Sequence, residues 1–113
     1  MENNYYEFNK LCKMLDNAKI PYERDDDDPN HDFYVKTSIL PMRRIKYGRH
    51  ERACVCSVIY GYGSYGVEKG LLEIMGLLTP EEEEFDSVIG DLTADDVFAR
   101  IKKHWDSVNK EIK

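Results

Sequence analysis

The sequence has few cysteines and no long hydrophobic run, and each absence excludes a class of protein. Its three cysteines, Cys12, Cys54 and Cys56, are too few and odd in number to build a framework of disulfide bonds. No apolar stretch approaches the roughly 20 residues that a membrane-spanning helix requires. The first residues, MENNYYEFNKL, also lack the basic start and apolar stretch of a secretion signal. We therefore expect a cytoplasmic protein that does not enter a membrane.

The length leaves little room for a second domain, because the chain has 113 residues. Hydrophobic residues make up 42% of the sequence, which is enough for a small core. We expect residues 1–113 to form a single compact domain.

Basic residues are missing from residues 80–96, which carry eight acids, and are scarce in residues 23–32, which carry six acids and one arginine. Residues 36–52 lie between these segments and carry six bases against one acid. The net charge is −6, and an acidic protein is a poor general binder of nucleic acid, because phosphates require cations. The basic segment 43–52 keeps a local phosphate contact open as an alternative.

Helical spacing of apolar residues predicts a first helix from Tyr5 to Ala18, ending before Ile20-Pro21. The following run of aspartates (25–28) and Pro29-Asn30 is expected to break regular structure. The C-terminal third is predicted to turn helical. Thr79-Pro80-Glu81-Glu82 has the pattern of a capping box, and Thr93 is expected to cap a final helix. The apolar stripe of that helix consists of Val97, Ile101, Trp105 and Val108.

Four segments read as strands, because β-branched and aromatic residues are concentrated in them. They are residues 33–40, residues 43–48 with Ile45 and Tyr47 on one face, residues 51–60, and LLEIM (71–75). Both faces of residues 51–60 are largely apolar, which predicts a central strand covered at least in part on both sides. The predicted fold class is α+β, with N-terminal and C-terminal helices packed on an antiparallel sheet of three to five short strands.

The segment GYGSYG (61–66) matches the G-x-G-x-x-G fingerprint of dinucleotide-binding loops. That mechanism requires a long helix directly after the loop, whose N-terminus faces the pyrophosphate. Gly70, Gly76 and Pro80 interrupt the sequence that follows, so no full helix fits there. We therefore expect the glycines to form turns and no nucleotide cofactor to bind. The tyrosines among them, Tyr60, Tyr62 and Tyr65, are expected to be partly exposed.

Metal sites and catalytic groups have weak signatures. His50, Cys54 and Cys56 form at most part of a zinc site, which requires a fourth ligand. Asp26-x-Asp28-x-Asn30 begins like a calcium loop but has His31 where glycine is needed. His50, Cys54 and Glu73 are the residue types of a catalytic site, but no nucleophile motif surrounds either cysteine. We expect no metal, no cofactor and no enzymatic activity.

Residues 63–105 carry three motifs in succession: GSYG, then GLLEIMGLL, then D-S-V-x-G-x-L-T-A-x-x-V-F-x-R-I-K-K-H-W. This stretch resembles a group of small, uncharacterised proteins encoded by phages and prophages of Gram-positive bacteria. The resemblance implies a mobile-element origin and a role inside the bacterial cell. The group has no known activity, so the resemblance assigns a function to none of these residues.

Together these patterns suggest a non-enzymatic phage protein that binds a host or phage protein. An inhibitor of a defence nuclease or CRISPR complex is its most concrete form, because the acidic segments can imitate nucleic-acid charge. The alternative is a small nucleic-acid-associated protein that uses residues 43–52. We expect the partner to contact Arg43, Arg44, Tyr62 and Tyr65, because a hairpin of residues 43–48 and 53–60 would bring these residue types to one edge.

Overall fold

The computed structural model describes residues 5–26, 42–48, 54–61 and 63–110. Along the chain its elements are α1 (Tyr6–Asn17), β1 (Tyr22–Asp26), β2 (Arg43–Tyr47), β3 (Cys56–Tyr60), the short 3-10 helix η1 (Val67–Lys69), β4 (Leu72–Met75), α2 (Pro80–Phe85), β5 (Val88–Leu92) and α3 (Ala94–Lys110). No helix within the described ranges is both long and apolar enough to cross a membrane.

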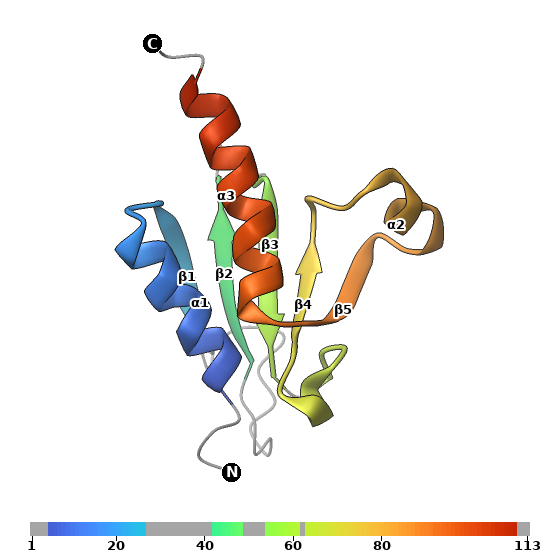
Figure 1. Cartoon of the computed structure of the whole chain (residues 1–113). Coiled ribbons are helices and arrows are strands. Elements are labelled where there is room, and N and C mark those ends of the chain that lie inside the picture. The colour runs from blue at the N-terminus through green and yellow to red at the C-terminus, as the bar shows by residue number, and fades with distance from the viewer. Residues whose placement is uncertain (1–4, 27–41, 49–53, 62, 111–113) are drawn as a thin grey trace.

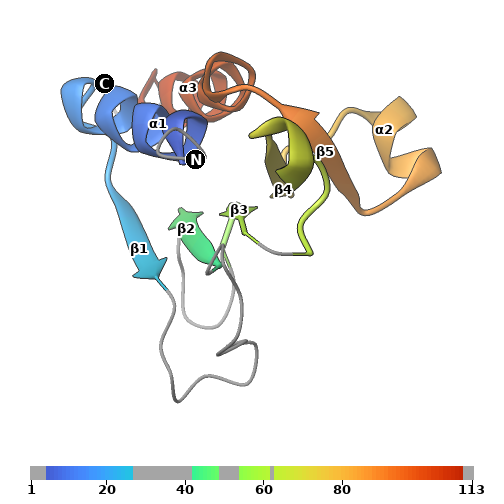
Figure 2. The ribbon, with the colours of Figure 1, turned by 90° about the horizontal axis from the view of Figure 1, so that it is seen from below.

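The five strands form one antiparallel sheet in the order of the chain, β1-β2-β3-β4-β5. Helices α1 and α3 lie next to each other on one face of this sheet (Figures 1 and 2). The short helix α2 lies beyond β5, on the chain segment that connects β4 to β5. This arrangement confirms the predicted α+β fold with N-terminal and C-terminal helices on a short antiparallel sheet.

The register of the strands divides their side chains between two faces. Ile45, Val58 and Ile74 are opposite one another on β2, β3 and β4, and all three are fully buried beneath the helices. Burying one such side chain stabilises the fold by about 1.5–3 kcal/mol. The neighbouring row, Arg44 and Ile59, points to the other face, because side chains alternate along a strand.

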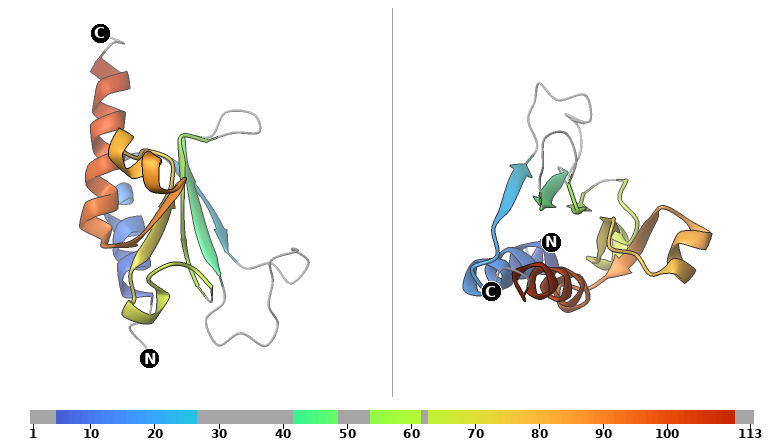
Figure 3. Two further views of the ribbon diagram at one scale, coloured as in Figure 1. Left: turned by 90° about the vertical axis from the view of Figure 1, so that its right-hand side faces the viewer. Right: turned by 90° about the horizontal axis from the view of Figure 1, so that it is seen from above.

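Near the middle of the sheet, both long helices bury the apolar stripe that was predicted from their sequence. In α1 the buried residues are Phe8, Leu11, Cys12 and Leu15. In α3, Val97 and Ile101 are fully buried, whereas Trp105 is half-buried and Val108 is 41% exposed. The stripe leaves the core because the C-terminal part of α3 extends past the end of the sheet (Figures 1 and 3).

The caps of α2 and α3 match their predicted form. Thr79 accepts a hydrogen bond from the Glu82 N–H and the Glu82 carboxylate accepts one from the Thr79 N–H, with Pro80 in the first turn. Thr93 and Asp96 exchange the same pair of hydrogen bonds at the start of α3. These reciprocal bonds satisfy backbone donors that a helix N-terminus leaves without partners.

The acidic stretch after α1 was wrongly predicted to break regular structure at residue 25. Residues 22–26 instead form the edge strand β1, whose register sets Glu23 opposite Lys46. Opposite charges on facing strands contribute about 0.2–1 kcal/mol per pair. Arg24 turns to the helices, with its guanidinium 5.4 Å from the centre of the Phe8 ring. The basic partner strand thus explains why an acidic sequence extends here.

One further expectation about the sheet needs correction. The C-terminal third is not wholly helical, because residues 88–92 form β5 between the two helices. Strand β3 is central, as predicted; the helices cover one of its faces, and on the other face Ser57 and Ile59 are half-buried. The strand predicted over residues 33–40 lies outside the described residues.

Candidate functional site

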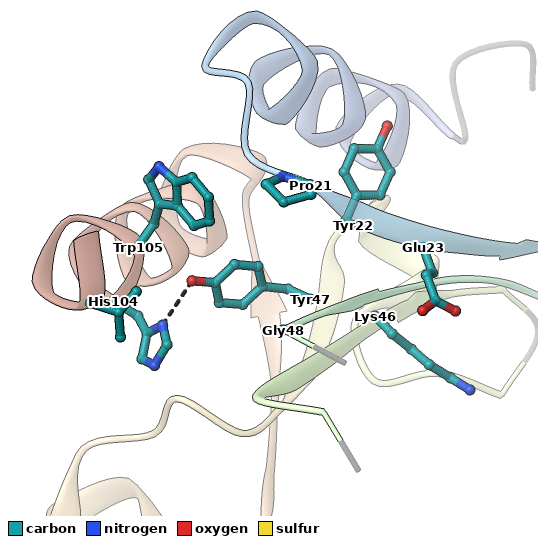
Figure 4. Close-up of a pocket in the computed structure, with 9 residues that line it drawn as sticks. Pro21, Tyr22, Glu23, Lys46, Tyr47, Gly48, His104 and Trp105 are labelled. Carbon is teal, nitrogen blue, oxygen red and sulfur yellow. Dashed lines mark hydrogen bonds between the residues drawn. The ribbon is translucent and has the colours of Figure 1, made fainter. Parts of the chain in front are cut away.

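A pocket of about 350 Å³ lies where the C-terminal part of α3 passes the ends of β1 and β2 (Figure 4). The start of β1, the end of β2 and the C-terminal part of α3 meet here and each contribute side chains to its walls. The pocket is lined by Pro21, Tyr22, Glu23, Lys46, Tyr47, Gly48, His104, Trp105 and Val108. We call it the Tyr47–His104 pocket.

A partly buried hydrogen bond forms the polar part of this pocket. The Tyr47 hydroxyl lies 2.7 Å from Nδ1 of His104, and Tyr47 is only 3% exposed. Burial raises the pKa of Tyr47, so its hydroxyl keeps its proton at neutral pH. Which of the two groups donates is set by the tautomer of the His104 ring.

The remaining walls are mainly aromatic and apolar. Trp105 faces Pro21 across the pocket, and the Tyr47 ring lies between them and β2 (Figure 4). The Tyr22 hydroxyl is directed to α1, where it donates to the Cys12 carbonyl at 3.4 Å. Lys46 and Glu23 extend away from His104. Such a combination of flat apolar walls and a single oriented imidazole is typical of a binding pocket.

The predicted partner residues are not all brought together. The predicted hairpin is present, with Arg43 opposite Tyr60 at the end distant from Gly48. Arg43 and Arg44, however, point to opposite faces of the sheet because they are consecutive in β2. The Arg43 guanidinium lies on the helix side, 4.0 Å from the centre of the Tyr5 ring. Tyr62 lies outside the described residues.

Arg44 and Tyr65 do share a face, the one that α1 and α3 leave uncovered. Arg44 lines a cavity of about 210 Å³ on this face, and Glu73 lies beside it. The Tyr65 N–H donates to Oε1 of Glu73 at 2.8 Å, and the Tyr65 side chain is 54% exposed. We define the opposite face by the residues that line this cavity, together with Tyr65: Met42, Arg44, Ser57, Ile59, Glu73 and Met75.

The glycine loop that precedes β4 differs from a dinucleotide-binding loop. Ser64 closes a tight turn, in which its hydroxyl donates to the Gly61 carbonyl at 2.8 Å and accepts from the Gly61 N–H. Gly66, with φ of +92°, then leads into the single turn of η1. The chain continues as the antiparallel strand β4, as predicted from LLEIM. Since no long helix follows the loop, its backbone lacks the geometry that holds a pyrophosphate.

Of the tyrosines in this loop, Tyr60 was wrongly expected to be partly exposed. It is fully buried, and its hydroxyl donates to the Val67 carbonyl at 3.1 Å. Tyr60 is the last residue of β3 and points to the helix side, where its ring packs edge-on against Tyr5. It therefore belongs to the core, whereas Tyr65 is available at the surface.

The cysteines and acids do not assemble a metal or catalytic centre within the described ranges, where no group of three metal-binding side chains converges. Cys56 is buried in β3, and burial raises the pKa of its thiol to about 12. A thiol protonated at neutral pH is a poor nucleophile and a poor ligand. His50 lies outside the described residues.

Sequence reasoning missed the Tyr47–His104 pocket, whose two polar residues are 57 positions apart. Two signals point to it in hindsight. Tyr47 was predicted on the same strand face as Ile45, and a tyrosine on a face that becomes buried requires a partner for its hydroxyl. His104 precedes Trp105 and lies between Ile101 and Val108, at a position that helical spacing places on the apolar stripe of α3.

Comparisons with models of protein families, with curated proteins and with solved structures found no match. The resemblance to phage proteins therefore stays a prediction.

Proposed function

We propose that this protein is a non-enzymatic binding protein whose opposite face docks onto another protein. The composition of that face carries the proposal. Met42, Ile59 and Met75 supply apolar area, Tyr65 supplies an exposed ring, and Arg44 supplies a planar cation. Methionine, tyrosine and arginine are enriched at protein–protein interfaces relative to the rest of the surface.

The sheet makes this face suitable for recognition. Arg44, Ile59 and Glu73 lie opposite one another on three adjacent strands, β2, β3 and β4. The antiparallel register of these strands places the three residues in one row. A row fixed by backbone hydrogen bonds loses little freedom when a partner binds. Arg44 and Glu73 give the row both signs of charge, which favours a partner with complementary polar groups.

In its more specific form, the proposal is a cytoplasmic phage protein that inhibits a host defence nuclease or CRISPR complex. Its support is the resemblance over residues 63–105 and the acidic segment 80–96. In that segment Glu81, Glu83 and Glu84 are exposed along α2, next to Phe85, which is 89% exposed. Proteins that bind nucleic acid carry basic surfaces, to which an exposed acidic helix is attracted.

The alternative, nucleic-acid binding by residues 43–52, has less support in the described part of this segment. Arg43 stacks on Tyr5 on the helix side, whereas Arg44 is on the opposite face. Their charges therefore do not add to one basic surface that follows a phosphate backbone.

The proposal is tested by affinity capture from a Gram-positive bacterial lysate with three forms of the immobilised protein. The forms are wild type, the double variant Arg44→Ala/Tyr65→Ala, and the control Lys103→Ala/Tyr6→Ala. The control removes one exposed base and one tyrosine of similar exposure on the helix side, since Tyr6 is 57% exposed. We expect the wild type and the control to retain the same protein and the double variant to lose it.

Equal capture by all three folded forms would contradict the docking site. Capture of DNA or RNA in place of a protein, with affinity that falls steeply with salt, would favour the alternative. Circular dichroism spectra establish that each variant is folded, which is expected because none of the four residues belongs to the buried core.

A further inference from the structure

Two rows of side chains cross the opposite face of the sheet, and both are centred on β3. The first row consists of Arg44, Ile59 and Glu73, on β2, β3 and β4, and all three are half-buried. It has a positive charge at one end, an apolar side chain in the middle and a negative charge at the other end. Because neighbouring strands lie about 4.8 Å apart, the Cα atoms of the two charged residues are roughly 10 Å from each other.

The second row lies two residues further along the strands and consists of Lys46, Ser57 and Met75. It again has a base on β2, but it has an apolar side chain on β4, where Met75 is 54% exposed. Strand β2 therefore presents two bases to this face, whereas β4 presents an acid and apolar area. A surface that fits this face has to offer acid and apolar area to β2 and a base to β4.

The face itself meets this requirement when it is turned over. A two-fold axis that runs parallel to the strands above β3 sets β2 of one copy over β4 of a second copy. Arg44 then faces Glu73 of the second copy, and Ile59 faces its own counterpart. In the second row, the apolar stem of Lys46 lies against Met75 of the second copy. In such an isologous interface each charged contact occurs twice, and two sheets packed face to face in this way keep their strands nearly aligned.

The other face-to-face arrangement is unfavourable. A two-fold axis that runs across the strands sets β2 over β2 of the second copy, so that Arg44 meets either Arg44 or Lys46 of that copy. Like charges that face each other across an interface oppose association. The charges of the opposite face thus select the axis that is parallel to the strands.

We propose that, without another partner, the opposite face is covered by the opposite face of a second copy of this chain, with Arg44 of each copy facing Glu73 of the other. This inference rests on the proposed docking function of the face and adds its regulation. A second copy and a protein partner compete for the same residues, so the pair has to dissociate before the partner docks. The amount of available face then depends on the protein concentration through mass action.

Sedimentation equilibrium of the purified protein measures this pairing without any partner. We expect the average mass to rise from 13.2 kDa towards twice this value as the concentration increases from about 5 to 500 µM. Arg44→Glu and Glu73→Arg each create two like-charge contacts in the pair. Each should therefore raise the dissociation constant of the pair by at least about tenfold.

Combining the two charge reversals should restore the pair in two ways. In one chain, Arg44→Glu/Glu73→Arg exchanges the charges at both contacts and should pair with a dissociation constant within about threefold of the wild type. An equimolar mixture of the two single variants should form a mixed pair, since one face then carries two acids and the other two bases. The control Lys103→Glu/Glu83→Arg reverses two exposed charges outside this face and should pair like the wild type.

Glu73 also accepts the Tyr65 N–H, so Glu73→Arg can disturb the glycine loop. Ile59→Lys supplies a second variant that leaves this hydrogen bond in place and sets two like charges on the two-fold axis. It should separate the pair, and circular dichroism establishes that each variant is folded. Unchanged pairing by folded Ile59→Lys overturns the inference.

The inference is also overturned if the wild type keeps the mass of a monomer up to about 500 µM, or if the mixture of single variants pairs no better than each variant alone. Either result leaves the capture of another protein by the opposite face unaffected, because no partner is present. Conversely, pairing that follows the charge reversals, together with equal capture by all three forms in the lysate experiment, supports the inference and overturns the docking site.

Discussion

At the scale of single residues, Glu82 makes an ion pair with Arg100 that no sequence pattern predicted, in addition to its predicted role in the cap of α2. Its carboxylate accepts from the Thr79 N–H and from both terminal nitrogens of Arg100, at 2.8 and 2.7 Å. Arg100 also donates to the Leu77 carbonyl at 2.9 Å. This two-pronged ion pair joins the short helix α2 to α3 and holds the connection between β4 and β5 against the rest of the fold.

We predict that Glu82→Gln lowers the free energy of unfolding by about 1 kcal/mol at pH 7, because glutamine keeps the cap but loses the charge that faces Arg100. The hydrogen bonds from Arg100 lower the pKa of Glu82 to about 2, from an ordinary value of 4.5. The ion pair therefore stabilises the fold fully above about pH 5, and this contribution is lost as the pH falls towards 2.

Urea unfolding of wild type and Glu82→Gln between pH 7 and pH 2.5 measures this difference. It should shrink as the solution becomes acidic. Glu83→Gln is the matched control on the same helix, since Glu83 is exposed. A Glu82→Gln difference that is constant with pH, or no larger than that of Glu83→Gln, would argue against the ion pair.

Gly90 is the second residue whose importance only the structure reveals. A Cβ atom at this position of β5 would lie 2.3 Å from Cβ of Tyr65. The missing side chain thus lets the glycine loop pack against β5 and places Tyr65 beside Glu73 on the opposite face.

Gly90→Ala is expected to destabilise the protein by about 1–3 kcal/mol, the usual range for forcing a methyl group into a packed site. Thermal unfolding checks this, with Ser87→Ala as an exposed control just before β5. If Gly90→Ala unfolds at the wild-type temperature, the loop does not rest on β5 as described.

At the scale of elements, local signals predicted the helices well, because α2 and α3 carry capping residues and α1 carries apolar residues at helical spacing. Thr79 and Thr93 mark the first turns of α2 and α3, and the apolar spacing of α1 places Phe8 and Leu15 in the core. Such signals depend on residues three or four apart, so a single sequence contains them in full.

The two edge strands were missed because their stability comes from elsewhere in the chain. Strand β1 is acidic and extends because basic β2 lies opposite, with Glu23 facing Lys46. Strand β5 contains Gly90 and Asp91, residues that are rare in strands, and its pairing with β4 is interrupted by an irregular register. Neither pairing is visible in local composition.

The cap of α3 gives a prediction at this scale. Thr93→Ala should lower the free energy of unfolding by about 1 kcal/mol, because the Asp96 N–H loses its side-chain acceptor. Thr93→Ser, which keeps the hydroxyl, should retain most of the stability. Chemical unfolding of both variants checks the cap, and equal stabilities of the alanine and serine variants would show that the hydroxyl contributes nothing.

At the scale of the whole molecule, the two faces of the sheet differ in composition. One face, built from residues such as Ile45 and Val58, is sealed by α1 and α3 and holds the fold together. The other presents Arg44, Tyr65 and Met75 and is where we propose that a protein docks. Sequence reasoning found Arg44 and Tyr65 by their residue types. It grouped them with Arg43, although consecutive residues of a strand such as Arg43 and Arg44 point to opposite faces.

The Tyr47–His104 pocket was beyond sequence reasoning for a different reason. Its residues come from three distant segments, and they meet only because α3 extends past the sheet over the end of β2. Which residues a helix brings over a sheet end depends on how α3 packs against the whole fold, and no local pattern encodes that.

The most direct test of the central claim is a calorimetric titration of the captured protein with the three forms of this chain. The account predicts that Arg44→Ala/Tyr65→Ala raises the dissociation constant at least tenfold, which corresponds to a loss of about 1.4 kcal/mol of binding free energy. The control Lys103→Ala/Tyr6→Ala should bind like the wild type. Binding by the folded Arg44→Ala/Tyr65→Ala variant with unchanged affinity would contradict the claim that the opposite face is the docking site.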